Sequence, residues 1–262
     1  AIQALQDFSL LPAFFDRQQQ GMLNFMYLAR LLKHEAGFAG HQAFQSGGVP
    51  AFDNSIVYYD GNSQGGILGG ALMGVIQDVT RGVLGVPGMA YSFLLRRSVD
   101  FDVYKPFFGG SATGEDGGGY PSIKDQVFLL SLAQMLWDRA EASGYAYHIE
   151  NNTLPNTPAH AVLLQVAYGD HQVSMWAAES MARAIGARLR VPALEPGRHP
   201  DSNAYVGLEP VPAGEFLGSV ISIWDNGPVG GGADNGGSAP PPITNTPPFE
   251  PDFGEDPHSR PR

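Results

Sequence analysis

Tyr59-Asp60-Gly61-Asn62-Ser63-Gln64-Gly65-Gly66 is the stretch that decides the fold of this chain. Before it, residues 55–59 are apolar and rich in β-formers, which predicts a short strand, and the small apolar residues 65–75 after it predict a helix. The centre matches G-x-S-x-G, in which a serine occupies a sharp turn between a strand and a helix. Such a turn leaves no room for side chains two positions away from the serine. We therefore predict Ser63 as a nucleophile, with Gly61 and Gly65 required beside it.

Strand and helix patterns alternate along the rest of the chain. Apolar runs predict strands at residues 81–86, 161–167 and 217–224, and helical spacing of apolar residues predicts helices at 12–33, 123–142 and 175–185. This alternation is typical of a parallel sheet covered by helices, so the predicted fold class is α/β. We expect helix 12–33 to pack on the sheet. Phe128, Met135 and Trp137 share a helical spacing and are expected in the core.

Composition narrows the class of protein further. The 262 residues include 34 glycines and 21 prolines, which excludes a coiled coil or a simple helical bundle. The net charge of -11 and the lack of a long Lys/Arg run argue against nucleic acid or an anionic membrane as a partner. No apolar run is long enough to predict an integral membrane segment. No cysteine is present, and the histidines lack metal-ligand spacing, so we predict no metal and no cofactor.

A serine nucleophile needs a base that takes its proton and an acid that orients the base. Asp170 follows the predicted buried strand 161–167, at the carboxyl edge of the sheet, where ligands bind in α/β folds. It is therefore the candidate acid, and the alternative is a helix N-cap or turn aspartate.

The chain resembles the α/β-hydrolase superfamily, and within it the bacterial serine carboxylesterases and lipases. The resemblance rests on Gly61-Asn62-Ser63-Gln64-Gly65, on the strand that closes on Gly169-Asp170, and on the alternation from residue 54 to 224. It implies a mainly parallel sheet flanked by helices, with a cap or lid inserted at about 88–122 in a core of residues 1–226. Several strands precede the serine in that superfamily, whereas only 54 residues precede the predicted strand here. The N-terminal part of the core is therefore expected to be missing from this sequence.

The resemblance also implies a histidine after the last core strand. His258 is the only histidine beyond residues 217–224, and it lies in a Gly/Pro-rich C-terminal loop, 227–262, whose composition is typical of a linker. This makes His258 the candidate base, although the connection that carries it is long. His199 is the competing base. His171 is expected at the rim of the site or capping a helix.

These expectations define a serine esterase. Ser63 would attack an ester, His258 would transfer the proton, Asp170 would orient the imidazole, and the N–H of Gln64 would stabilise the oxyanion. An aromatic and apolar stretch at 89–108 predicts a lid or acyl-binding wall, so the expected substrates are uncharged small-molecule or polymeric esters with apolar acyl groups. Within that stretch, the candidate substrate-binding residues are Met89, Tyr91, Phe93 and Leu94.

Two other functions remain open from the sequence. The same triad would serve an acyltransferase or a peptidase, because residues outside the triad select the acceptor and the leaving group. The chain could also be a binding protein that has the hydrolase fold and no activity. A secreted or cell-envelope location is slightly favoured, and the sequence does not determine the oligomeric state.

Overall fold

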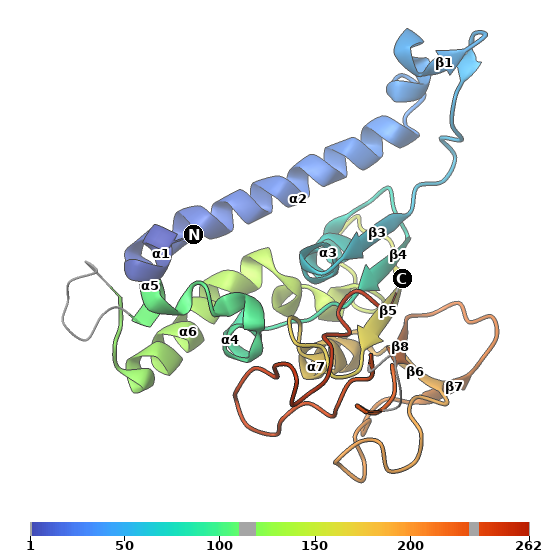
Figure 1. Cartoon of the computed structure of the whole chain (residues 1–262). Coiled ribbons are helices and arrows are strands. Elements are labelled where there is room, and N and C mark those ends of the chain that lie inside the picture. Colours follow the sequence, from blue (N-terminus) through green and yellow to red (C-terminus); the bar gives the residue numbers. More distant parts are fainter. Residues whose placement is uncertain (1, 110–118, 231–235, 262) are drawn as a thin grey trace.

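A six-stranded, all-parallel sheet forms the centre of the computed structural model, which describes residues 2–109, 119–230 and 236–261 (Figure 1). The strand order is β3-β4-β5-β8-β6-β7, and every neighbouring pair is parallel. Helices flank this sheet, which confirms the α/β class. The strands are β3 (Tyr59–Asn62), β4 (Arg81–Gly85), β5 (Ala161–Ala167), β6 (Arg188–Val191), β7 (Pro210–Pro212) and β8 (Val220–Trp224).

Three of the connections between successive strands are crossovers that contain a helix, the usual link between parallel strands. They contain α3 (Gln64–Val75) between β3 and β4, α6 (Ile123–Trp137) between β4 and β5, and α7 (Met175–Ile185) between β5 and β6. The main core contains buried residues of α3, α7 and the sheet, including Met73, Leu164, Met181 and Ile221. Helix α6 ends before the predicted residue 142, because the backbone becomes extended at Glu141.

The largest differences between the predicted and observed strand boundaries are at the starts of β3 and of β8, which begins at Val220 instead of residue 217. The first strand begins at Tyr59 instead of Ser55. Tyr59 pairs with Gly82, the second residue of β4, so the residues before Tyr59 extend past the start of β4. The short strands β6 and β7 were not predicted. Two of the three residues of β7 are prolines, which cannot donate to a ladder and are a signal against a strand.

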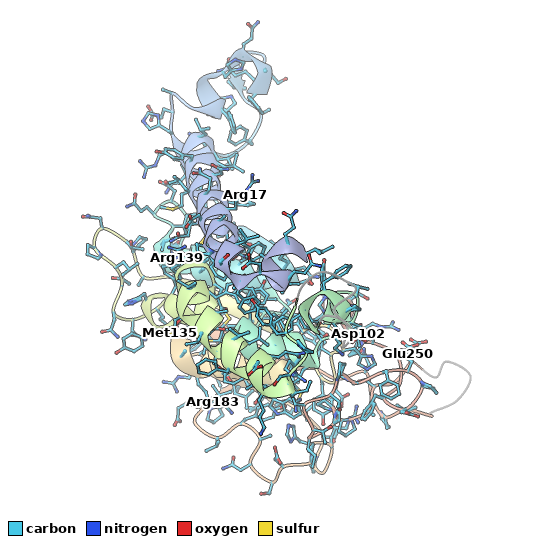
Figure 2. The ribbon with its side chains drawn as sticks, turned by 90° about the vertical axis from the view of Figure 1, so that its left-hand side faces the viewer. Arg17, Asp102, Met135, Arg139, Arg183 and Glu250 are labelled. Atoms are coloured by element: carbon cyan, nitrogen blue, oxygen red, sulfur yellow. The ribbon has the colours of Figure 1, made fainter. Side chains whose placement is uncertain are left out.

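The N-terminal segment forms α1 (Ile2–Gln6) and the long helix α2 (Leu11–Lys33). The expectation that this helix packs on the sheet is wrong: it packs on α3 and α6 and extends beyond them (Figure 1). Asp16 of α2 forms an ion pair of 2.8 Å with Arg139, which lies just after α6; Figure 2 labels Arg139. Beyond α2 lies a hairpin of β1 (Gln45–Ser46) and β2 (Val49–Pro50).

The predicted lid, 88–122, is described except for residues 110–118, which lie outside the described residues. It contains α4 (Tyr91–Leu94) and α5 (Lys105–Gly109). These helices group with α6 and the start of α2 at one end of the sheet (Figure 1). Short 3-10 turns cover Phe8–Leu10, Phe38–Gly40, Gln42–Phe44, Leu95–Arg97, Val99–Phe101, Asp138–Ala140, Ala142–Gly144 and Ala146–His148.

The C-terminal segment forms no helix or strand in its described parts, 227–230 and 236–261. Residues 231–235 of the predicted loop lie outside the described residues. It nevertheless packs on the domain, because Ser238 is fully buried and its Oγ donates to the carbonyl of Tyr168 at 3.0 Å. Within the segment, Ser238 forms an antiparallel bridge with Gly254. Among the described helices, none is long and apolar enough to cross a membrane.

Candidate active site

Ser63 lies in the sharp turn between β3 and α3, with backbone angles φ 58° and ψ -119°. Such a conformation is strained for a residue with a side chain, and a hydrogen bond of 2.9 Å from its N–H to the carbonyl of Gly85 helps to hold it. A Cβ at Gly61 would lie 2.6 Å from the carbonyl oxygen of Gly65, so Gly61 is required. The prediction that Gly65 is also required is wrong, because a Cβ there would lie 3.8 Å from the hydroxyl of Tyr59, an ordinary contact distance. At Gly66, in contrast, a Cβ would collide with the carbonyl oxygen of Gly85.

The structure brings Ser63, His258 and Asp170 together, although 195 positions separate the serine from the histidine. Nε2 of His258 lies 2.9 Å from Oγ of Ser63, and its Nδ1 lies 2.9 and 3.0 Å from the two carboxylate oxygens of Asp170. Asp170 follows β5 and is buried, and its Oδ1 accepts 2.8 Å hydrogen bonds from the N–H groups of Gln172 and Val173. The three side chains therefore form a hydrogen-bonded chain from a buried carboxylate to a hydroxyl.

The charges around His258 favour its protonated form. Burial lowers the pKa of His258, but the hydrogen bond and the negative charge of Asp170 act in the opposite direction, and Asp256 and Asp100 add to them. The pKa of His258 therefore lies above its ordinary value of 6.5. Burial raises the pKa of Asp170, and the hydrogen bond from His258 acts against that rise. An imidazolium at this position is stabilised, as a proton-transferring base needs.

These charges predict a pH profile. His258 must be neutral to accept a proton, so kcat/KM should rise with pH through the pKa of this histidine, with a midpoint above 6.5. Asp100→Asn removes a negative charge that favours the imidazolium, so the midpoint should move to lower pH. Asp102→Asn is the matched control, because Asp102 pairs with Lys105, whereas the charges that raise the pKa of His258 are those of Asp170, Asp256 and Asp100. Equal midpoints in wild type and Asp100→Asn would contradict this prediction.

The two other histidines considered from the sequence lie apart from Ser63. The ring of His199 packs between Tyr168 and Tyr205, at centroid distances of 5.9 Å, and its Nδ1 accepts from the N–H of Asp201. His171 is buried and its backbone N–H donates to Asp256, and the N-cap of the helix that follows is Ser174, so His171 does not cap that helix. Of the three histidines, the structure brings only His258 to the serine.

Several contacts hold the segment that carries His258. Arg198 forms a bidentate pair with Asp225, at 2.7 and 2.8 Å, and also donates to the carbonyl of Ser238. Asp256 accepts from the backbone N–H groups of His171 and His258, both at 3.1 Å. The composition of 227–262 is typical of a linker. In the structure, however, individual buried or half-buried polar contacts hold this segment in place. The sequence signal that could have revealed this was Asp256, two residues before the histidine.

Gln64 is the first residue of α3. The N–H of a first helical residue has no acceptor within its own helix, and the positive end of the helix dipole favours negative charge there. An oxyanion formed at Ser63 would therefore have one donor available in the adjacent residue.

The four predicted wall residues do not share one surface. Tyr91 lines a cavity of about 250 Å³ together with Gln64, and its ring stacks on Trp137 at 4.5 Å. Met89, Phe93 and Leu94 instead line a separate pocket beside Trp176. Tyr91 and Phe93 are two positions apart on α4 and therefore point to different sides of it, and Met89 precedes this helix. The backbone N–H groups of Ala90 and Tyr91 donate to the fully buried Glu141, which positions this turn.

The expectation that Phe128, Met135 and Trp137 all belong to the core is wrong for two of them. Phe128 and Met135 are 63% and 73% exposed, and Met135 lies on the outer side of α6 (Figure 2). The buried side of this helix contains Gln126, Leu130, Ala133 and Trp137, which follow one another three or four positions apart. Trp137 therefore has a double role, in the core and in the wall of the 250 Å³ cavity.

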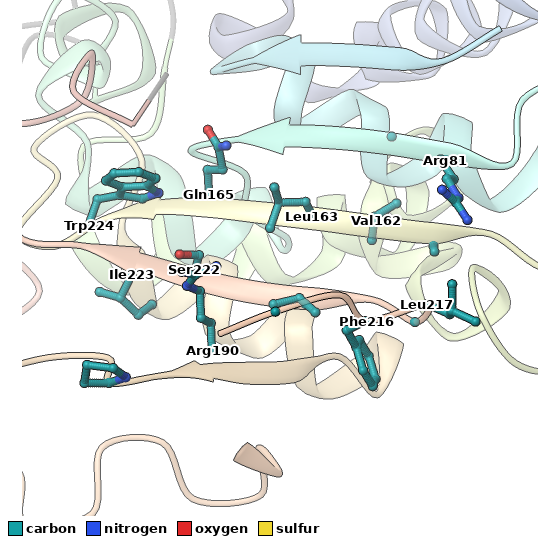
Figure 3. A pocket seen from close by; sticks show the side chains of 16 residues that line it. Arg81, Val162, Leu163, Gln165, Arg190, Phe216, Leu217, Ser222, Ile223 and Trp224 are labelled. Atoms are coloured by element: carbon teal, nitrogen blue, oxygen red, sulfur yellow. The ribbon is translucent and has the colours of Figure 1, made fainter. Parts of the chain in front are cut away.

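A larger hollow of about 570 Å³ lies elsewhere, against one face of the sheet. Figure 3 shows its lining, with Leu163 and Gln165 from β5 and Ser222 and Trp224 from β8. It includes no residue of the Ser63, His258 and Asp170 set. Within the part of the chain that the structure describes, no three His, Asp or Glu side chains gather as a metal site would require.

Comparison with protein-family models, with curated proteins and with solved structures gives no match.

Proposed function

We propose that this protein is a serine hydrolase that cleaves carboxylic esters with apolar acyl groups. The observation that carries the proposal is the hydrogen-bonded chain in which His258 lies 2.9 Å from Ser63 Oγ and 2.9 Å from Asp170 Oδ2. A buried acid, an imidazole and a hydroxyl in this order recur in unrelated acyl-transfer enzymes, because the chemistry requires that order. The strained turn at Ser63 supports the same function.

The proposed reaction has two halves. Ser63 Oγ attacks the ester carbonyl while its proton moves to Nε2 of His258, and the N–H of Gln64 stabilises the resulting oxyanion. The bond from the carbonyl carbon to the alcohol oxygen then breaks, and His258 returns the proton to the leaving alcohol. In the second half, water attacks the acyl enzyme and gives its proton to His258. The acid leaves, and the proton returns to Ser63.

A fluorophosphonate probe tests the proposal directly. Such a probe phosphonylates an activated serine, so the wild-type protein should be labelled rapidly and Ser63→Ala not at all. Ser55→Ala is the matched control, since Ser55 lies before β3 in a segment outside the triad, and it should be labelled like wild type. Absence of labelling in the wild type would contradict the proposal and would favour a binding protein without activity. Product analysis with an added alcohol would separate hydrolysis from acyl transfer.

The charge and the apolar wall predict substrate preference. The chain has a net charge of -11, and the cavity beside Gln64 is lined mainly by apolar and aromatic side chains. We expect p-nitrophenyl esters of short to medium acyl chains to be hydrolysed best and an anionic hemiester to be hydrolysed worst. The measurement is kcat/KM across the series. A clear preference for the anionic hemiester would contradict the expected apolar acyl group.

A further inference from the structure

A cavity of about 250 Å³ lies between the N-terminal helices and the segment that follows β4. Ala4, Leu11 and Phe14 contribute one side, and Tyr91 and Trp137 contribute to the other. Its wall also includes Gln64, the residue directly after the nucleophile. If the ester carbonyl lies at Ser63, with its oxygen at the N–H of Gln64, the acyl chain beyond the carbonyl is therefore next to this cavity.

The size and the lining of the cavity fit an acyl chain. An apolar cavity of about 150 Å³ holds benzene, so 250 Å³ has room for roughly ten carbon atoms. The stacked rings of Tyr91 and Trp137, together with Leu11 and Phe14, form an apolar surface. A medium-length chain would fill this space and bury its methylene groups, each of which contributes about 0.8 kcal/mol.

Two side chains in this apolar wall have a buried polar atom without a partner among the described residues, Gln18 at Oε1 and Trp137 at Nε1. Gln18, on α2, lines the cavity, and its Oε1 is buried without a hydrogen-bond partner among the described residues. A buried amide oxygen without a partner is unfavourable, because it has lost water and gained nothing in exchange. A ligand group that pairs with it would remove that penalty. A hydroxyl both donates and accepts, so it can pair with the amide in either orientation.

We propose that this cavity binds the acyl chain of the substrate and that Gln18 recognises a hydroxyl group on that chain, so that hydroxyacyl esters are the preferred class. The proposal rests on the proposed hydrolase function. It makes Gln18 a specificity-determining residue, supplied by the N-terminal helices and not by the segment at 88–122. A plain acyl chain would leave the amide buried and unpaired, which is the basis for discrimination.

The experiment compares p-nitrophenyl octanoate with hydroxyoctanoates that carry the hydroxyl near the carbonyl or near the chain end. For wild type, kcat/KM should be at least about tenfold higher for the best hydroxyoctanoate ester than for p-nitrophenyl octanoate. A tenfold ratio corresponds to about 1.4 kcal/mol, which is the contribution of one buried hydrogen bond. Gln18→Leu should abolish this preference by slowing the hydroxyoctanoate and accelerating octanoate. Gln19→Leu is the matched control, because Gln19 is the next residue on α2 and is not in the lining; it should keep the wild-type ratio.

A second variant tests the cavity itself. Leu11→Trp would fill it, and should therefore lower the ratio of kcat/KM for p-nitrophenyl octanoate to kcat/KM for p-nitrophenyl acetate. Hydrolysis of p-nitrophenyl acetate also shows that each variant is folded. No preference for any hydroxyoctanoate in wild type, or the same ratio in Gln18→Leu, would overturn the inference while the hydrolase function stands. A wild-type protein that the fluorophosphonate probe does not label would instead overturn the proposed function.

Discussion

His258→Ala is expected to lower ester hydrolysis at least about 10³-fold, with the fold retained. The physical reason is the loss of the imidazole whose Nε2 lies 2.9 Å from Oγ of Ser63. Without it, the serine loses the base that accepts its hydroxyl proton as the Oγ–carbon bond forms. The measurements are kcat/KM with a p-nitrophenyl ester and the circular dichroism spectrum.

His199→Ala is the matched control for this prediction. His199 packs between two tyrosines away from the serine, so its replacement should leave the proton transfer intact. Turnover close to wild type in His258→Ala, together with loss in His199→Ala, would transfer the role of the base to His199 and refute the triad.

Asp170→Asn is expected to lower kcat about 10³- to 10⁴-fold. The carboxylate accepts from Nδ1 of His258 at 2.9 Å and thereby leaves Nε2 free to receive the serine proton. An amide can present its NH₂ group to Nδ1 instead, which favours the wrong tautomer and leaves the imidazolium without its counter-charge. The effect should therefore fall on kcat, with a smaller change in KM.

Asp256→Asn provides the contrast to Asp170→Asn. Asp256 accepts from two backbone N–H groups and from the side chain of Gln172, so it holds the loop and does not contact the imidazole of His258. We expect a much smaller loss of kcat than in Asp170→Asn. Equal losses in the two variants would show that the carboxylate of Asp170 has only a structural role.

The local sequence determined the turn that carries Ser63, because the geometry of that turn depends mainly on neighbouring residues. A strand, a tight turn and a helix within residues 59–75 need small residues at defined positions, so the conformation of Ser63 and the need for Gly61 could be read from neighbouring residues. Asp170 could also be located, because the apolar strand before it ends at the edge of the sheet where the serine lies. The α/β class followed from the same alternation of strands and helices.

Only the tertiary structure decided the contacts made between distant segments. Gly66, not Gly65, lies against β4, since only the pairing of β3 with β4 brings the carbonyl of Gly85 to that point. The position of His258 depends on polar contacts between distant segments, such as the N–H of His171 with Asp256, which have no periodic signal. The position of Gln18 in the cavity wall could not be predicted either. Helical periodicity indicates which residues share one face of a helix, but not which segments of the fold pack against that face. Sequence patterns report local backbone preference and burial, whereas a site assembled across the chain requires the fold.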